Sequence, residues 1–188
     1  MAYSSVLDKD IFEVLVNQEQ IDEVTTRIAA EIDRDFKDSK RILLLCILKG
    51  SVVFMGDLMK KISLPVEIDF MKVSSYHGGT ESSGRINIIL DLHRHDLSEC
   101  DIIVVEDIID SGRTLSYLVD YLSLNGAHSV KTCTLLDKPS RREVEFTPDY
   151  RGVEIEDKFV VGYGLDYAEM YRALPYIGVL KPEVYTKK

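Results

Sequence analysis

The sequence predicts an α/β fold, in which a parallel, twisted sheet is flanked by helices. Short apolar runs alternate along the chain with stretches whose apolar residues recur at helical spacing. One run, residues 41–48, is continuously apolar after its first residue, which is typical of a strand buried on both faces of a parallel sheet. The chain has 188 residues without an internal repeat or a linker rich in Pro, Gly and Ser, so one domain spanning 1–188 is expected.

Each element of this alternation has a local signal. Residues 17–36 place Ile21, Val24 and Ile28 at helical spacing between acids and amides, which predicts a surface helix packed on the sheet. The run at 41–48 ends at a Lys-Gly-Ser turn that opens a second helical pattern. The further expected elements are helix 52–61, strands 66–74, 86–90 and 102–105, helix 114–124 and strand 130–136. Strands alternating with helices favour right-handed crossovers between parallel strands.

Turn-forming residues bound the later elements. Pro65 precedes the strand at 66–74, as fits a strand start, and Asn125-Gly126 ends the helix at 114–124. Residues 75–84 contain four small-residue breakers and no apolar period, which predicts a loop.

The last third of the chain lacks the strand and helix rhythm. After Asp137-Lys138-Pro139 the pattern becomes irregular, and this part is expected to pack beside or over the carboxyl edge of the sheet. It could supply a small hood lobe, with contributions from about 1–16 and 150–188.

Composition limits the class of protein. The 23 basic and 32 acidic residues give a formal net charge of −9, which argues against nucleic acid as the main partner because counterion release rewards concentrated positive charge. The first residues lack the pattern of a signal peptide and no apolar run approaches membrane-spanning length, so a cytoplasmic protein without a membrane partner is expected. Cys46, Cys100 and Cys133 are far apart in the sequence, which predicts free, buried thiols.

Residues 104–116 carry the most functional information. An apolar strand runs into Glu106 and Asp107, and ligands bind at the carboxyl ends of strands in open α/β sheets. Such an acidic pair is expected to bind ribose hydroxyls, a divalent cation or both. The turn from Asp110 to Thr114 then opens a helix, where backbone N–H groups and the helix dipole favour a phosphate. The stretch therefore predicts a site for a phosphorylated sugar.

This pattern resembles the phosphoribosyl pyrophosphate signature of the type I phosphoribosyltransferases. Two further stretches are similar to the hypoxanthine-guanine branch of that family: Leu48-Lys49-Gly50, and residues 157–167 with the sequence Asp-Lys-Phe-Val-Val-Gly-Tyr-Gly-Leu-Asp-Tyr. The motifs occur in order from the first buried strand to Arg172. The resemblance implies transfer of ribose 5-phosphate from phosphoribosyl pyrophosphate to hypoxanthine or guanine, giving IMP or GMP and pyrophosphate, with Mg²⁺ as cofactor.

The resemblance also implies which residues hold the donor. The expected ribose and 5′-phosphate residues are Glu106, Asp107, Asp110, Ser111, Gly112, Arg113 and Thr114. The expected pyrophosphate residues are Lys49, Gly50, Ser75, Tyr76 and Arg172. The expected metal ligands are Glu106, Asp107 and Asp166. In this family the peptide before the loop lysine can be cis, and residues 75–84 resemble the flexible lid.

The purine needs an edge reader, a stacking surface and a proton acceptor. Lys138 is expected to donate to the 6-oxo group, which favours hypoxanthine and guanine over adenine because an ammonium cannot accept from a 6-amino group. Phe159 resembles the stacking ring, the backbone of Val160 could receive the ring N1–H, and Asp166 completes the base-binding set. Asp110 is the candidate general base, taking the proton at N7 as N9 attacks the anomeric carbon.

Other interpretations remain open at this stage. A regulatory protein of the same fold could sense phosphoribosyl pyrophosphate, although it would need a nucleic-acid-binding face. A dinucleotide-binding protein is disfavoured by the missing G-x-G-x-x-G, and a receiver would place its acids on separate strands. Arg141-Arg142 could approach a phosphate or a neighbouring subunit, but a solvated basic turn is favoured. The tyrosine-rich tail at 163–185 is expected to pack a lobe and to contribute to the surface of a homodimer or homotetramer.

Overall fold

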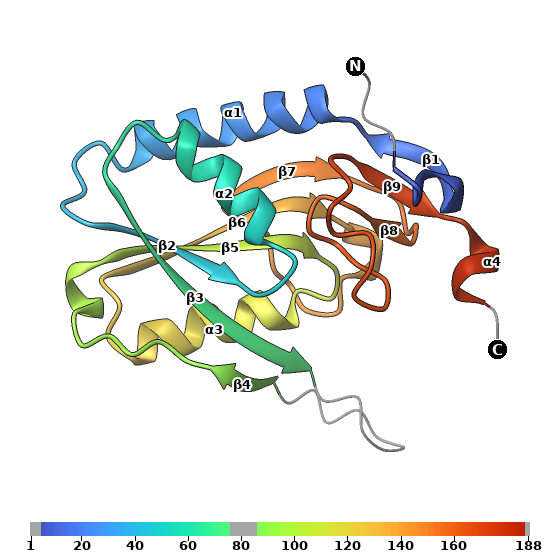
Figure 1. The fold of residues 1–188 in the computed structure, drawn as a ribbon. Coiled ribbons are helices and arrows are strands. Elements are labelled where there is room, and N and C mark those ends of the chain that lie inside the picture. Colours follow the sequence, from blue (N-terminus) through green and yellow to red (C-terminus); the bar gives the residue numbers. More distant parts are fainter. Residues whose placement is uncertain (1–4, 76–85, 187–188) are drawn as a thin grey trace.

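The computed structural model describes residues 5–75 and 86–186 and confirms a central, mostly parallel sheet flanked by helices (Figure 1). Its strands are β2 (Ile42–Ile47), β3 (Val66–Ser75), β4 (Ile86–Leu90), β5 (Asp101–Ile109), β6 (Ser129–Asp137) and β7 (Tyr150–Glu154). They lie in the order β4-β3-β2-β5-β6-β7. All neighbours are parallel except β4, which runs antiparallel to β3.

Helices cover both faces of this sheet. They are α1 (Gln18–Asp35), α2 (Val52–Lys61) and α3 (Arg113–Leu124). Short 3-10 turns at Asp8–Asp10 and Leu97–Glu99 precede β1 (Ile11–Val16) and β5, and a third at Pro139–Arg141 follows β6. The first two helices pack on one face and α3 on the other (Figure 1). Within β2, Leu44 and Cys46 join the core beneath α1 and α2, whereas Leu43 and Leu45 join the core beneath α3. This burial on both faces explains why the strand is continuously apolar.

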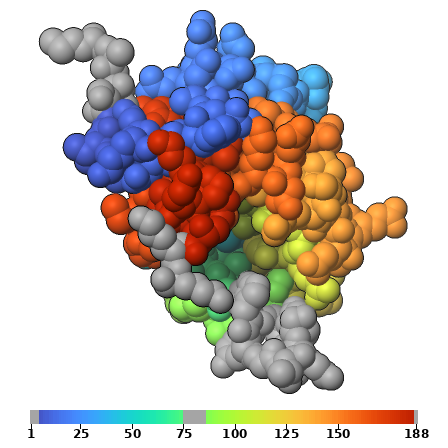
Figure 2. All heavy atoms as spheres, turned by 90° about the vertical axis from the view of Figure 1, so that its right-hand side faces the viewer, coloured from blue at the N-terminus to red at the C-terminus, as the bar shows by residue number. Residues whose placement is uncertain are grey.

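A second, three-stranded sheet unites distant parts of the chain. Its strands are β1 (Ile11–Val16), β8 (Val160–Val161) and β9 (Ile177–Leu180), followed by the short helix α4 (Pro182–Tyr185). β9 lies in the middle and pairs antiparallel with both neighbours. Figure 2 shows the early residues in blue beside the late residues in red on one face of the molecule.

The observed elements differ from the expected ones at β5, β7 and β1, and β8, β9 and α4 were not predicted either. β5 does not end near Val105 but continues to Ile109, because Glu106, Ile108 and Ile109 still pair with β6. β7 was not predicted; it is an edge strand with only Tyr150 buried, so it lacks the apolar run of a central strand. β1 was not predicted either, because its outward side chains Phe12 and Val14 hide the alternation that usually marks a half-buried strand.

The strand order places a topological switch point between β2 and β5. From β2 the chain crosses by α2 to β3 on one side, whereas α3 carries β5 to β6 on the other side. The connections leave the carboxyl ends of β2 and β5 in opposite directions, which opens a crevice where ligands bind in sheets of this kind. The Lys-Gly turn and the acidic strand are thus brought to the same place.

The composition also led to expectations about the cysteines and about membrane-spanning segments. Cys46, Cys100 and Cys133 are buried free thiols, as predicted. Among the described helices, none combines the length and the apolar composition that crossing a membrane requires.

Candidate active site

The phosphate-binding candidates lie where β5 leads into α3. Gly112 is the N-cap of α3 with φ of +80°, a conformation that favours glycine, and an added Cβ would come within 3.0 Å of Cδ of Arg142. The carbonyl of Ser111 accepts hydrogen bonds from the N–H groups of Glu143 at 3.0 Å and Val144 at 3.3 Å. The loop is therefore held from behind at the start of a twelve-residue helix, where the helix dipole attracts an anion.

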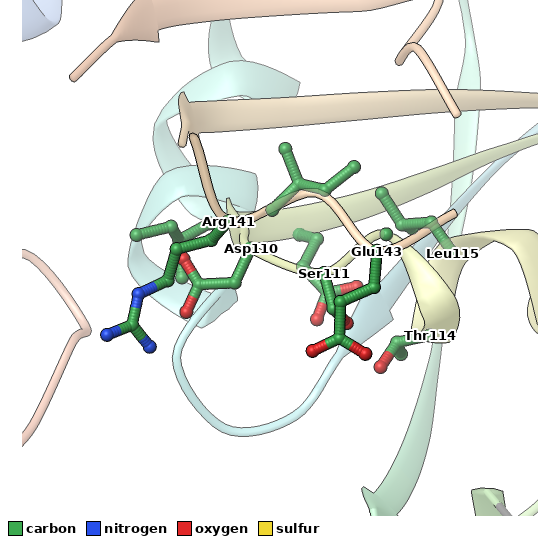
Figure 3. A pocket seen from close by; sticks show the side chains of 10 residues that line it. Asp110, Ser111, Thr114, Leu115, Arg141 and Glu143 are labelled. Atoms are coloured by element: carbon green, nitrogen blue, oxygen red, sulfur yellow. The ribbon is translucent and has the colours of Figure 1, made fainter. Parts of the chain in front are cut away.

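A cavity of about 310 Å³ opens over this loop. The predicted residues that line it are Glu106, Asp110, Ser111, Gly112 and Thr114. Figure 3 shows Asp110, Ser111 and Thr114 together with side chains of the segment after β6. The structure therefore gathers most of the predicted ribose and phosphate residues around one space; we call it the phosphate cavity.

Two predicted members of this set lie elsewhere. The Arg113 guanidinium is directed to Glu143, with Nε 2.7 Å from Oε2 on an exposed surface. Asp107 is the neighbour of Glu106 on a strand, so the two side chains leave β5 on opposite faces. Glu106 lines the phosphate cavity, whereas the Asp107 carboxylate lies against Gly50.

Burial sets the charge of the acidic pair. Burial raises the pKa of the Glu106 carboxyl well above its usual range, and the charge of Asp107 adds to the effect. Burial also raises the pKa of Asp107 to about 6, although the N–H of Ile108 donates to it at 2.9 Å and Arg172 lowers the value. Oε2 of Glu106 is shielded from solvent and has no hydrogen-bond partner within the described residues. A buried carboxyl oxygen without a partner can accept a hydrogen bond from a hydroxyl group of a ligand or bind a cation.

The turn after β2 packs directly on Asp107. The peptide between Leu48 and Lys49 is cis, as the resemblance allows. A Cβ added to Gly50 would lie 1.6 Å from Oδ2 of Asp107, so only glycine permits this approach. The carbonyl of Gly50 in turn leaves no room for a Cβ at Gly164, which would lie 1.9 Å away. The Lys-Gly turn is therefore in direct contact with both the acidic strand and the segment at 157–167.

Arg172 joins this corner through an ion-pair cluster. Its Nη2 lies 2.7 Å from Oδ1 of Asp166, and its Nη1 donates to the carbonyl of Gly164 at 2.8 Å. Nζ of Lys49 lies 3.0 Å from Glu169, whose carboxylate is also 3.4 Å from Arg172. The predicted pyrophosphate cations are thus next to one another and are neutralised by acidic residues in the absence of an anion.

A second cavity, of about 380 Å³, adjoins the first and holds the predicted base residues. We call it the base cavity, and its predicted members are Asp110, Lys138, Phe159 and Val160. Lys138 is only 6% exposed, and its ammonium lies 3.9 Å from a carboxylate oxygen of both Asp110 and Asp157. These separations are too long for hydrogen bonds, so the buried ammonium keeps its donors available. Asp166 lies instead at the Arg172 corner.

Several residues of the two cavities were missed by the sequence analysis. Ile108, Leu165 and Tyr185 line the base cavity, and their apolar side chains carry no chemical signal in the sequence. Arg142 was taken for part of a solvated turn, which is wrong: its guanidinium donates to the carbonyl of Asp110 and pairs with the buried carboxylate of Asp137. The neighbouring strand could have suggested this pairing, because a buried aspartate requires a partner.

Other predicted roles stay untested by the coordinates. Ser75 is the last residue of β3, and Tyr76 lies outside the described residues, as does nearly all of the expected lid at 75–84. Within residues 5–75 and 86–186, no group of three or more His, Cys, Asp or Glu side chains could hold a metal ion unaided. The magnesium site at Glu106, Asp107 and Asp166 therefore stays a prediction.

Comparisons with known proteins agree with this geometry. A hypoxanthine-guanine phosphoribosyltransferase of Lactococcus lactis is 53% identical over 181 residues, which span 96% of this chain and 97% of the relative. A protein of the same name from Streptococcus pyogenes is 49% identical, with 97% and 100% of the two chains covered. The crystal structure of a hypoxanthine phosphoribosyltransferase from Staphylococcus aureus has 45% identity and a TM-score of 0.92, covering 99% of this chain and 100% of that one.

The family match includes the parts of the chain that build the site. The model of the phosphoribosyl transferase domain family matches residues 14–168. This range contains every strand of the main sheet, the loop from Asp110 to Thr114 and the turn at Pro139–Arg141. The chain therefore belongs to the phosphoribosyltransferase family, within its hypoxanthine-guanine branch.

Proposed function

We propose that this enzyme transfers the 5-phosphoribosyl group from phosphoribosyl pyrophosphate to hypoxanthine or guanine in purine salvage, forming IMP or GMP. The observation that carries the proposal is the way the two cavities adjoin. The phosphate cavity and the base cavity share Ile108, Asp110 and Arg141. A sugar phosphate in one and a purine in the other would meet beside Asp110, where the new N-glycosidic bond has to form.

The donor binds through its phosphate and ribose. The backbone and hydroxyl groups from Asp110 to Thr114 receive the 5′-phosphate, and the start of α3 adds its dipole. Glu106 and Asp107 then accept hydrogen bonds from the ribose hydroxyls, directly or through a metal. The unpaired Oε2 of Glu106 supports this assignment, because a buried acceptor gains most from a donor that arrives with the substrate.

The pyrophosphate end binds at the corner formed by Lys49, Gly50 and Arg172. An arriving anion would compete with Glu169 for the two cations, which lie within ion-pair distance of that one exposed carboxylate. The hard carboxylate oxygens of Asp107 and Asp166 are of the type that Mg²⁺ prefers, and these residues would hold that ion. When bound, it would supply positive charge near the leaving group.

The purine is held on its edge and on its faces. Lys138 donates to O6, the backbone of Val160 accepts from N1–H, and Phe159 stacks on the ring. Ile108 also lines this cavity and adds an apolar contact. Asp110 receives part of the N7 proton as N9 bonds to the anomeric carbon and pyrophosphate leaves. The ammonium of Lys138 lies 3.9 Å from a carboxylate oxygen of Asp110, so the residue that reads the 6-oxo group and the residue that receives the proton are neighbours.

The rest of the molecule has supporting roles in the proposal. Residues 1–188 act as one domain in the cytoplasm as a homodimer or homotetramer, without nucleic-acid or membrane partners. The three-stranded sheet, built from segments within 1–16 and 150–188, serves as the hood over the base. The regulatory alternative is not favoured, because the named relatives are enzymes.

A base-competition assay tests the function. Purified protein with phosphoribosyl pyrophosphate is offered hypoxanthine, guanine, xanthine and adenine, with and without Mg²⁺. Nucleotide formation from hypoxanthine and guanine, dependent on Mg²⁺ and at least tenfold above adenine, is expected from the donor at Lys138 (about 1.5–3 kcal/mol for a charged hydrogen bond). A preference for adenine, or binding of the donor without any transfer, would refute the proposal.

A further inference from the structure

Three aromatic rings form a cluster at the mouth of the base cavity. The ring of Tyr185 in α4 stacks on Phe159, with centroids 4.7 Å apart and planes inclined by 20°. Tyr167 meets both rings edge-on, with centroids 5.8 Å from Phe159 and 6.4 Å from Tyr185. Offset stacking and edge contacts of this kind are the favoured aromatic geometries. The stacking candidate for the purine is therefore itself part of a stack.

We propose that Tyr185 is a positioning residue of the base cavity, which holds Phe159 by one face so that its other face is presented to the purine. This inference rests on the proposed function. Phe159 remains 41% exposed although Tyr185 and Tyr167 both pack on it, so a large part of the ring is still available. Tyr185 also lines the base cavity directly, together with Lys138 and Asp110.

The backbone around Tyr185 is anchored, as a positioning role requires. The N–H of Leu180 donates to the carbonyl of Phe159 at 2.9 Å, which ties β9 to the strand that follows this ring. The next residue, Lys181, donates its N–H to the carbonyl of Asp10 at 2.9 Å. α4 begins directly after this pair of contacts, so Tyr185 is one short helical turn away from two fixed points.

We expect the aromatic ring of Tyr185, and not its hydroxyl, to position Phe159. Among residues 5–75 and 86–186 the hydroxyl of Tyr185 makes no hydrogen bond, in contrast to Tyr163 and Tyr171, whose hydroxyls donate to Asp57 and Asp10. A planar side chain at Tyr185 restricts Phe159 before the base arrives, which reduces the ordering that base binding has to impose. The effect should therefore appear in the affinity for the base and not in donor binding.

Steady-state kinetics of Tyr185→Leu and Tyr185→Phe test this inference. Tyr185→Leu is expected to raise KM for hypoxanthine about fivefold, the size of an aromatic stacking contribution, with kcat and KM for phosphoribosyl pyrophosphate within twofold of the wild type. Tyr185→Phe keeps the ring and should match the wild type. Tyr117→Leu is the matched control, because Tyr117 also stacks on a tyrosine, Tyr121, but lies on α3 outside the base cavity.

The possible outcomes separate this inference from the proposed function. An active wild type with an unchanged or lowered KM for hypoxanthine in Tyr185→Leu would overturn the positioning role alone. An equal rise in both KM values, or the same rise in Tyr185→Phe, would also overturn it. Tyr185→Met provides a second apolar replacement without an aromatic ring should Tyr185→Leu not fold. A wild type that transfers to no 6-oxopurine would instead refute the function.

Discussion

At the scale of single residues, the surroundings of the Lys138 ammonium determine which hydrogen bonds it can make. It is almost fully buried, yet both neighbouring carboxylates stay at 3.9 Å. A buried charge normally has closer partners, because the desolvation it suffers must be offset. The position of the group at the wall of the base cavity therefore suits a donor reserved for a substrate oxygen.

Replacing Lys138 should alter the choice of base. For Lys138→Ala we expect kcat/KM for hypoxanthine to fall about 10- to 100-fold, while the low value for adenine changes little, because only the 6-oxo group loses a charged hydrogen bond. Both values come from initial rates with each base. Lys158→Ala is the control, since that ammonium lines the same cavity but is held by Glu13 at 2.7 Å. An unaltered oxo preference in Lys138→Ala would contradict the assignment.

Asp110 and Asp157 form a second matched pair at this scale. Each places a carboxylate oxygen 3.9 Å from Lys138, but only Asp110 also lines the phosphate cavity. Asp110→Asn should lower kcat about 100-fold through loss of the proton acceptor, with KM for the donor nearly unchanged. Asp157→Asn should change kcat less than threefold. Equal effects of the two substitutions would assign the loss to charge beside Lys138 and not to proton transfer.

The acidic strand predicts an unusual dependence of stability on pH. The pKa of Asp107 rises from 3.8 to about 6 on folding, so the folded protein retains a proton that the unfolded chain has already lost. This contribution to stability is present below pH 3.8 and is lost as pH rises through 6. At pH 7.5 the uncharged variant Asp107→Asn should therefore be more stable than the wild type, by about 3 kcal/mol.

Urea denaturation of the protein without ligands measures this difference. The stabilisation by Asp107→Asn should disappear near pH 4, where the wild-type carboxyl is protonated in the folded state. A variant that is less stable than the wild type at pH 7.5, or equally stabilised at both pH values, would show that burial of this charge is not costly. Activity of Asp107→Asn should be low at every pH, because the amide carries no charge for the cation.

At the scale of elements, close packing of β5 and two turns fixes the geometry around Gly50. Gly50 contacts the carboxylate of Asp107, and Gly164 contacts the carbonyl of Gly50. The sequence predicted that these motifs belong together but gave no reason for glycine, since the reason is the approach of another segment. Ile108 and Tyr185 were missed for the same cause: their contribution depends on which loop lies opposite, not on local chemistry.

The strands most readily predicted from the sequence are those whose two faces are both buried. β2 and the apolar part of β5 follow from their sequences, because both faces are covered by helices. β7 and β1 lie at sheet edges with most of their side chains partly or fully exposed, and their sequences carry no such signal. The continuation of β5 through the acidic pair could not be foreseen either, because two adjacent acids are depleted in strands.

Gly50→Ala tests the loop contact against Gly56→Ala. The added methyl at Gly50 would overlap Oδ2 of Asp107 and displace either the carboxylate or the loop, so kcat/KM for the donor should fall about 100-fold. Gly56 lies in α2 with no atom within 4 Å of an added Cβ. Gly56→Ala should keep full activity and raise the free energy of unfolding by about 0.5–1 kcal/mol. Full activity of Gly50→Ala would contradict the described contact.

At the scale of the whole molecule, the acidic residues at the two ends of the main sheet have pKa values shifted in opposite directions. At the amino ends of the strands, Arg41 and Arg94 each pair with both Glu67 and Asp96, and these contacts lower the pKa of both acids. At the carboxyl ends, burial raises the pKa of the acids on β5. The charged groups at the amino ends thus pair with one another, whereas at the carboxyl ends Oε2 of Glu106 has no hydrogen-bond partner in the part of the chain that the structure describes.

Assembly is the prediction that concerns the molecule as a whole. Large apolar side chains are exposed on the β3 and β4 edge, where Ile68 is 44%, Ile89 54% and Leu90 40% accessible. Apolar side chains gathered at a surface favour association between chains. Light scattering should give two or four times the 21.4 kDa of one chain, and a mass of one chain would refute the expected homodimer or homotetramer.

The pairing of β1 with β9 has a consequence for the order in which the enzyme is made. β1 leaves the ribosome early, but its partner strand ends at Leu180, after the whole parallel sheet has been translated. The loop from Asp110 to Thr114 needs only segments that emerge well before that point. A nascent chain can therefore form the loop that we propose binds the phosphate while the sheet that we propose covers the purine still waits for β9.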